Sequence, residues 1–138
     1  MSDCIFCKIA NGEIPTNTVY EDADFRVILD ANPANPGHSL VLPKKHGADI
    51  FELDEETVAK AHAVARKTAE AVKAAVNADG VNILQNNGTA AWQSVMHYHI
   101  HVIPRFKGDW PSFPGHVSKV TDEEQKAICA KIAGEIKG

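Results

Sequence analysis

The 138-residue sequence lacks any apolar run long enough to cross a membrane, and its N-terminus lacks the basic-then-apolar pattern of a secretory signal. It also lacks a basic excess, because 14 Lys and Arg stand against 18 Asp and Glu, a formal net charge of −4. Nucleic-acid binding relies on neutralising several phosphates, whereas a small nucleotide needs only a few donors. We therefore expect a cytoplasmic protein with no membrane and no nucleic-acid partner.

Cysteine is scarce too, and three residues do not make the disulfide framework of a small secreted domain. Two of them form the pair Cys4-x-x-Cys7, which in a reducing compartment indicates either half of a zinc site or a redox pair. A redox dithiol normally follows a strand, and nothing strand-like precedes Cys4. Zinc is favoured provided that further ligands exist, and the alternative is a pair of small buried hydrophobic residues.

The length and composition are those of one soluble globular domain, with 44% hydrophobic and 23% charged residues. Alternating apolar residues between turn signals predict strands over residues 18–20, 25–29, 38–43 and 81–85. No internal repeat or low-complexity tract interrupts the chain.

Two helices are predicted from apolar spacing and end signals. The first runs from Asp54, its N-cap, to about Asn77, and its apolar stripe marks it as scaffold. The second opens at the capping box of Thr121 and Glu124 and carries three isoleucines on one face, Ile128, Ile132 and Ile136, with Cys129 beside them.

The most informative stretch is residues 96–102, in which His97, His99 and His101 alternate with apolar residues. On a β-strand these three histidines would share one face, while Met96, Tyr98, Ile100 and Val102 would share a core face. Adjacent histidines would stand about 6.6 Å apart and the outer two about 13 Å, too far for all three to hold one metal ion. We expect different tasks for them, in phosphate, metal or acid–base chemistry.

Further polar residues lie at the ends of the predicted strands. His38 and His46 bracket one strand, and Asp30 ends another, as a turn former or as an acceptor for sugar hydroxyls beside a phosphate site. Asn86, Gln93 and Ser94 precede the histidines in the chain, as ordinary loop residues or as neutral donors and acceptors around them. His62, on the long helix, is assigned no role.

The order of these blocks resembles that of the histidine triad (HIT) superfamily, whose motif His-x-His-x-His is matched by His97-Tyr98-His99-Ile100-His101. The resemblance covers nearly the whole chain and is closest to the HINT branch of nucleoside phosphoramidases and their bacterial relatives. It implies an α+β fold with an antiparallel sheet of about five strands and two main helices. It also implies a homodimer with a continuous sheet, built from a single domain over residues 1–138. The C-terminal segment, residues 105–138, would pack on the domain or on the partner subunit.

The resemblance further implies a purine nucleotide substrate in which AMP is linked to a leaving group, as in a phosphoramidate or a dinucleoside polyphosphate. His99 would be the nucleophile that forms a nucleotidyl-histidine, and water would then release the nucleoside monophosphate. By the same resemblance, His101 and His38 would contact phosphate oxygens as catalytic residues. The nucleotide-binding residues would include Asp30 on the ribose, Asn86, Gln93 and Ser94 near the phosphate, and Ile5, Phe6, Ile9 and Ile28 around the base.

The resemblance also supplies the missing half of the metal site. It implies structural Zn²⁺ held by Cys4, Cys7, His46 and His97, a closed Cys2His2 set. Two other classes of function stay open: a zinc-stabilised nucleotide-binding dimer that acts mainly as a protein-interaction module, and a zinc hydrolase with metal-bound water.

One departure from the family concerns the residues just before Gln93. HINT-like chains usually have glycines there, whereas this chain has Ala90-Ala91-Trp92. A backbone with positive φ would be costly for these residues, and Trp92 would narrow the leaving-group side.

Overall fold

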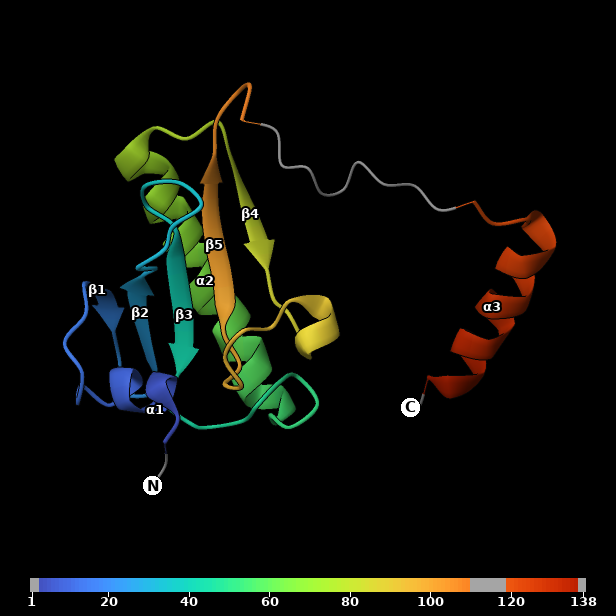
Figure 1. Ribbon diagram of the computed structural model, residues 1–138, viewed down its shortest axis with the longest axis horizontal. Helices are drawn as coiled ribbons and strands as arrows, with labels where there is room; N and C mark the ends of the chain where they lie inside the picture. The colour runs from blue at the N-terminus through green and yellow to red at the C-terminus, as the bar shows by residue number, and fades with distance from the viewer. Residues whose placement is uncertain (1–2, 110–118, 137–138) are drawn as a thin grey trace.

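The computed structural model describes residues 3–109 and 119–136, and its core is a five-stranded antiparallel sheet with helices on both faces (Figure 1). The elements, in chain order, are α1 (Ile5–Ala10), β1 (Thr18–Glu21), β2 (Phe25–Leu29), β3 (Ser39–Pro43), α2 (Glu55–Val76), β4 (Gly80–Leu84), the short 3-10 helix η1 (Thr89–Ala91), β5 (Ile100–Arg105) and α3 (Asp122–Glu135). Among the described residues, none of these helices combines the length and apolarity needed to span a membrane. The order and pairing of these helices and strands confirm the predicted α+β fold with an antiparallel sheet.

The sheet order is β1-β2-β3-β5-β4, so β5 lies between β3 and β4. All neighbouring strands are antiparallel, and β2 and β3 pair along their whole length, from Phe25 opposite Pro43 to Leu29 opposite Ser39. Because β5 is internal, the chain that leads into it enters the middle of the sheet. The histidine-rich segment is thereby brought against β3 and the residues that flank it.

Two apolar clusters cover opposite faces of this sheet, because successive strand residues point to opposite sides. Val27 and Val41 face α2, and the neighbouring Ile28, Leu40 and Leu42 face α1. The α2 side carries the larger cluster, which also includes Tyr98, Ile100 and Val102. The α1 side is closed by Phe6, Ile9 and Ala10. The histidines thus share their face of the sheet with a small second core.

The long helix α2 begins and ends as the sequence predicts. The Asp54 side chain caps its N-terminus by accepting a hydrogen bond from the Thr57 amide, and Asn77 closes it in a left-handed conformation. Ala61, Ala65 and Val72 from the predicted stripe are buried, whereas His62 is exposed, as expected for a residue without a role in the core. These ends are readable from the sequence because capping is a local interaction.

The predicted histidine strand is shorter than expected, and this corrects the geometry of the row. β5 begins at Ile100, so only His101 lies in a strand, while His97 and His99 precede it. The His97 amide donates to the Val95 carbonyl over 2.8 Å, which turns the chain out of the sheet at this point. Met96 is 42% exposed and does not belong to the core face to which the alternation assigned it. The cysteine pair, moreover, lies at the start of an additional short helix, α1, with Cys4 as its N-cap and Cys7 in its first turn.

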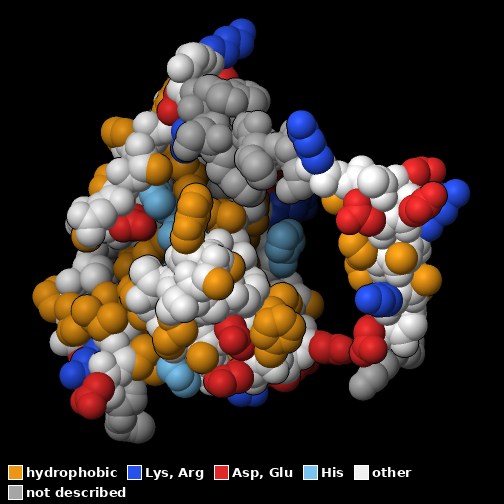
Figure 2. Space-filling view, turned by 45° about the vertical axis from the view of Figure 1, so that its right-hand side comes forward, with side chains coloured by type: hydrophobic (Ala, Val, Ile, Leu, Met, Phe, Trp, Pro, Cys, Tyr) orange, Lys and Arg blue, Asp and Glu red, His pale blue; other side chains and the backbone are white. Residues whose placement is uncertain are grey.

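The last helix, α3, opens with the predicted capping box of Thr121 and Glu124. None of its described residues is buried, and Ile128, Ile132 and Ile136 are 46%, 57% and 74% exposed. Figure 2 shows this helix apart from the body of the molecule, with hydrophobic side chains on its surface. Of the C-terminal segment 105–138, residues 110–118 and 137–138 lie outside the described part of the chain.

Candidate functional site

Two side-chain clusters meet at the segment that leads into β5, and the first contains the cysteine pair. Cys4 and Cys7 come from α1, His46 follows β3, and His97 lies just before β5. The Cys7 Sγ lies 3.2 Å from His46 Nδ1 and 3.4 Å from His97 Nδ1, and Cys4 Sγ lies 3.4 Å from His97 Nδ1. All four potential ligand atoms lie within 4.8 Å of one another.

These distances fit a tetrahedral metal ion. With Zn–N and Zn–S distances of about 2.0–2.3 Å, the edges of a tetrahedron are roughly 3.3–3.8 Å long. The two imidazole Nδ1 atoms of His46 and His97 are 3.2 Å apart, close to such an edge. Two thiols and two imidazoles are also the donor set that zinc prefers, and four protein ligands complete its coordination. The residues present therefore fit Zn²⁺, and they would fill its coordination sphere.

Backbone contacts fix the direction in which His97 presents its lone pair. Its Nε2 lies 2.8 Å from the Pro43 carbonyl oxygen, which can only accept, so Nε2 carries the proton and Nδ1 is left as a ligand. The ring is fully buried. Burial lowers the pKa of His97, which favours the neutral form that a metal requires.

The second cluster begins at His99, two residues further on, where the opposite ring nitrogen is engaged. His99 Nδ1 lies 2.7 Å from the carbonyl oxygen of His97, so Nδ1 donates and the lone pair is on Nε2. The ring is 4% exposed and is held edge-on by Phe6 on one side and His101 on the other, with centroid distances of 4.9 and 5.0 Å. This is an oriented imidazole whose Nε2 is not used by the Nδ1 hydrogen bond.

A chain of hydrogen bonds sets the protonation of the neighbouring histidines. The Ala34 amide donates to His38 Nδ1 over 2.9 Å, so His38 carries its proton on Nε2. That Nε2 lies 2.9 Å from His101 Nδ1 and 3.4 Å from a carboxylate oxygen of Asp30. His101 thus accepts at Nδ1 and carries its own proton on Nε2, from which it can donate to an anionic ligand.

Burial also shifts the protonation equilibria of this cluster. It lowers the pKa of His38 and of His99, although the Asp30 carboxylate raises both in part. Burial, reinforced by the neighbouring His99 and His38, lowers the pKa of His101 to about 4. The neutral form of all three rings is therefore favoured at pH 7.

Asp30 is a turn former, as one of the two interpretations of the sequence has it, and it also faces the histidine cluster. One carboxylate oxygen accepts from the Asn32 amide over 2.8 Å, as in a turn, and the other faces His38. Its backbone amide donates to the His38 carbonyl over 2.8 Å, which ties the loop between β2 and β3 together. The side chain is only partly buried and stands at the edge of the histidine cluster.

The polar residues before the histidines are placed differently from one another. Gln93 is 3% exposed and fully engaged: its Oε1 accepts from the Gly88 amide, and its Nε2 donates to the carbonyls of Ala48 and Val95. Ser94 is exposed. Asn86 is partly buried and donates to the Trp92 carbonyl over 3.4 Å. Gln93 therefore anchors the segment, whereas Ser94 is accessible to a ligand.

Most of the apolar residues predicted around a base are packed in the core. Phe6, Ile9 and Ile28 belong to the smaller core and are 9%, 7% and 3% exposed. Ile5 is 49% exposed and offers a surface at the same end of α1. Phe6 contacts the rings of both His97 and His99, so it links the two clusters.

Trp92 adopts the backbone conformation that the sequence suggested would be costly. It ends η1 with φ 68° and ψ 23°, in the left-handed region, and its side chain is 76% exposed. A non-glycine residue in this region is strained by about 1–2 kcal/mol. The ring is therefore displayed to solvent immediately before Gln93 and Ser94.

Sequence reasoning missed the backbone groups that set the tautomers. The Pro43 and His97 carbonyls and the Ala34 amide decide which nitrogen of each imidazole is available. No side-chain pattern could have identified them, because every residue carries the same carbonyl and amide groups.

The geometry is that of a domain with a metal-type cluster and a histidine-type cluster on one segment, and comparison with known proteins identifies its class. Residues 11–108 match the family model of the HIT domain. Adenosine 5′-monophosphoramidase hnt1 of Schizosaccharomyces pombe is 39% identical over 97% of this chain and 98% of its own length.

Two solved structures resemble the chain closely. A HIT family protein of Bacillus subtilis superposes with a TM-score of 0.89 at 37% identity, covering 99% of both chains, α3 included. A Zn-bound histidine triad family protein from Mycobacterium smegmatis superposes with a TM-score of 0.77 at 41% identity, covering 96% of this chain and 94% of that one. The chain belongs to the HIT family.

Proposed function

We propose that this protein is a nucleotide hydrolase that cleaves the α-phosphate linkage of an AMP-type compound through a covalent intermediate on His99. The observation that carries the proposal is the tautomer of His99, whose Nδ1 donates to the His97 carbonyl and leaves Nε2 with its lone pair. The named activity of the yeast relative, an adenosine 5′-monophosphoramidase, supports this substrate class.

In the first step, His99 Nε2 attacks the α-phosphorus, and a P–Nε2 bond forms as the bond to the leaving group breaks. With a phosphoramidate, the leaving nitrogen takes up a proton from solvent and departs as ammonia or an amine, while the phosphorylated His99 ring keeps its Nδ1 proton. The water that attacks in the second step returns a proton to solvent. His101 donates from Nε2 to a phosphate oxygen, and His38 holds it in that tautomer over 2.9 Å. Asp30 accepts from the ribose hydroxyls at the edge of the cluster.

In the second step, water attacks phosphorus, the P–Nε2 bond breaks, and the nucleoside monophosphate leaves. Neutral imidazole suits both steps, because it is nucleophilic at pH 7 and departs readily from phosphorus. An acceptor other than water, such as a second phosphate, would turn the same intermediate into a nucleotidyl transfer. The physiological leaving group would contact Ser94 and the exposed Trp92 first.

Zinc held by Cys4, Cys7, His46 and His97 would be structural in this proposal. The ion would join α1, the turn after β3 and the segment before β5. Four protein ligands leave no open position for a reacting water, which disfavours metal-bound hydroxide as the nucleophile. The Zn-bound mycobacterial relative supports the choice of metal.

The proposal includes a homodimer in which two sheets join at an edge, in the cytoplasm. β4 is an edge strand of the sheet, and Ile83 on it is 41% exposed. An exposed apolar edge strand favours pairing with a second chain.

Rapid-quench intact mass spectrometry after mixing with adenosine 5′-phosphoramidate tests the mechanism. The expected result is a transient AMP-sized adduct followed by free AMP. His99→Ala should abolish the adduct and lower the rate about a thousandfold or more. His62→Ala, which removes an exposed histidine from α2, is the matched control and should behave as wild type.

AMP release without an adduct in the wild type, retained by His99→Ala, would overturn the covalent mechanism. Loss of turnover on zinc removal from a protein that stays folded would point instead to metal-bound water. Binding of the phosphoramidate with no turnover by either protein would favour a nucleotide-binding dimer whose task is protein interaction.

A further inference from the structure

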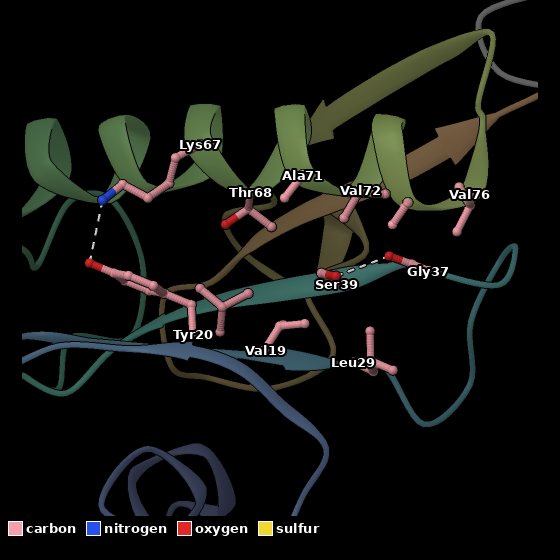
Figure 3. A pocket seen from close by; sticks show the side chains of 12 residues that line it. Val19, Tyr20, Leu29, Gly37, Ser39, Lys67, Thr68, Ala71, Val72 and Val76 are labelled. Carbon is pink, nitrogen blue, oxygen red and sulfur yellow. Dashed lines mark hydrogen bonds between the residues drawn. The ribbon is translucent and has the colours of Figure 1, made fainter.

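An apolar groove lies on the side of the sheet opposite the histidines. It has a volume of about 470 Å³ and runs between α2 and strands β1 to β3 (Figure 3). The α2 wall presents one helical face over three turns, Lys67, Thr68, Ala71, Val72, Ala75 and Val76. The opposite wall includes Val19 and Leu29, which are 55% and 37% exposed. Among the described residues, these side chains form an apolar surface that solvent reaches.

Helix α3 and its C-cap residue, Ile136, present an apolar row of matching length. Ile128, Ile132 and Ile136 follow one another at intervals of four residues and are all exposed. The row spans eight residues, about 12 Å, and the α2 wall from Lys67 to Val76 spans nine, about 13–14 Å. The small side chains of Ala71 and Ala75 allow a second helix to approach closely, at an axis separation of about 8–10 Å.

The position of α3 indicates which copy of the groove it occupies. Figure 1 shows α3 beyond the β4 side of the sheet, whereas its own groove borders β1, β2 and β3 at the other side. The alignment with the Bacillus subtilis chain covers 99% of both chains with a TM-score of 0.89, so it extends over α3. A second copy joined at β4 would lie on the side toward which α3 extends.

We propose that α3 of one subunit docks into the apolar groove between α2 and strands β1 to β3 of a second copy of this chain, and that the two copies exchange α3 reciprocally. Ile128, Ile132 and Ile136 would replace water along the apolar α2 wall and bury Val19 and Leu29 of the partner's groove. The proposal rests on the homodimer proposed above and is independent of the chemistry at His99.

The docked helix would support the partner's nucleotide site through the sheet. Leu29 precedes Asp30, and Gly37 and Ser39 flank His38, so the groove backs the loop that carries both site residues. Gly37 is packed tightly there, since an added Cβ would lie 3.1 Å from Val76 Cγ1, and its φ is +100°. Loss of α3 should therefore raise KM more than it lowers kcat.

Cross-linking of two singly substituted chains tests the exchange. One chain carries Ala71→Cys at the middle of the groove, the other Ile132→Cys at the middle of the α3 row, both in a Cys129→Ser background and zinc-loaded. A short bismaleimide should give a covalent heterodimer in the mixture. Ala130→Cys, on the opposite face of α3, is the matched control and should give at least about tenfold less covalent heterodimer.

A doubly substituted chain separates the two possible origins of the helix. A cross-link within one chain, of monomer size, would show that α3 docks on its own domain and would overturn the exchange. If the cysteines at positions 71 and 132 are cross-linked neither between two chains nor within one chain, docking of α3 in the groove is overturned.

A second measurement requires no cross-linker. Ile132→Asp places a charge in the proposed interface, while Ala130→Asp places it on the opposite, solvent-facing side. By analytical ultracentrifugation, Ile132→Asp should weaken dimerisation about tenfold or more, and its melting temperature should fall by about 5 °C or more. Equal behaviour of the two variants would contradict the proposal, because both positions are exposed in the subunit itself.

Discussion

His97 and His99 are two residues apart and both buried, yet they present opposite ring nitrogens to the clusters around them. His97 directs Nδ1 toward two thiols and a third imidazole, and its Nε2 is held by the Pro43 carbonyl. His99 has its Nδ1 held by a carbonyl and presents Nε2 instead. The backbone thus selects which ring nitrogen is available, for the proposed metal ligand at His97 and for the proposed nucleophile at His99.

The two clusters also differ in how complete they are. The cysteine cluster offers four donors to one point and leaves no position for a substrate. In the histidine cluster, His38 and His101 hold each other, with Asp30 alongside, while the tautomers of His99 and His101 leave one nitrogen of each for a ligand. One cluster is thus suited to stability and the other to reaction, and changes to each should separate these two properties.

The largest expected effect is on stability, from loss of the metal cluster. Cys7→Ser, or removal of zinc by a chelator, should lower the free energy of unfolding by about 4 kcal/mol, because the cluster ties three separate segments together. Adduct formation per folded molecule should persist. Denaturant unfolding with and without zinc measures the first quantity, and single-turnover mass spectrometry the second.

Cys129→Ser is the control for this prediction, because Cys129 is exposed on α3 and distant in sequence from the cluster. It should alter neither the free energy of unfolding nor adduct formation. If Cys7→Ser left stability unchanged, the cysteine cluster would not be a source of stability. If it removed adduct formation from a protein that is still folded, the cluster would not be separate from the reaction.

The next effect is on turnover, from the hydrogen bond between His38 and His101. His38→Ala removes the donor that fixes the His101 tautomer and should lower kcat about a hundredfold. His38→Gln keeps an N–H at the equivalent position and should restore part of this loss. Steady-state kinetics on adenosine 5′-phosphoramidate distinguish the two, and equally impaired variants would show that the tautomer is not what His38 supplies.

The histidine cluster should also show in the pH dependence of stability. Burial lowers the pKa of His101 to about 4, from an unfolded value near 6.5, so the unfolded chain binds more protons between these limits. Stability contributed by the neutral ring is present above pH 6.5 and is lost as the pH falls toward 4.

Urea unfolding of the wild type and of His101→Gln between pH 7 and 4.5 checks this expectation. The wild type should lose stability more steeply than the variant, which cannot titrate at this position. A parallel loss in both proteins would mean that other groups, such as the metal ligands, dominate the acid sensitivity.

The sequence predicts the fold better than it predicts the site. The ends of α2 and α3 follow from Asp54 and Thr121, because caps are local, and β2 follows from a mainly apolar segment, interrupted only by Arg26, between turn signals. Whether His97 and His99 belong to β5 was not readable, because the bend at Val95 depends on contacts with distant segments such as the turn at Gly47.

The site could be predicted as a set of residues but not as an arrangement. The sequence pattern and the family resemblance identified the four potential metal ligands that the structure brings within 4.8 Å. They gave Gln93 a place near the phosphate, whereas its amide is used on three backbone groups. Side-chain type indicates what a residue can bind, but its actual partners are set by tertiary packing.

The smallest expected effect lies just outside both clusters, at Trp92. Its φ of 68° strains any side chain with a Cβ, so Trp92→Gly should be more stable than Trp92→Ala by about 1 kcal/mol. Both variants lack the exposed ring, so lost contacts cancel between them. Ala91→Gly is the control, because Ala91 is not among the described residues with positive φ and should gain nothing. Thermal unfolding of the three variants measures the difference. The same variants separate the strain from any role of the ring in binding the leaving group. Trp92→Gly and Trp92→Ala should hydrolyse the phosphoramidate at equal rates. If both differ from wild type on phosphoramidates with a large amine, the Trp92 ring acts on the leaving group, and its backbone strain is separate from that role.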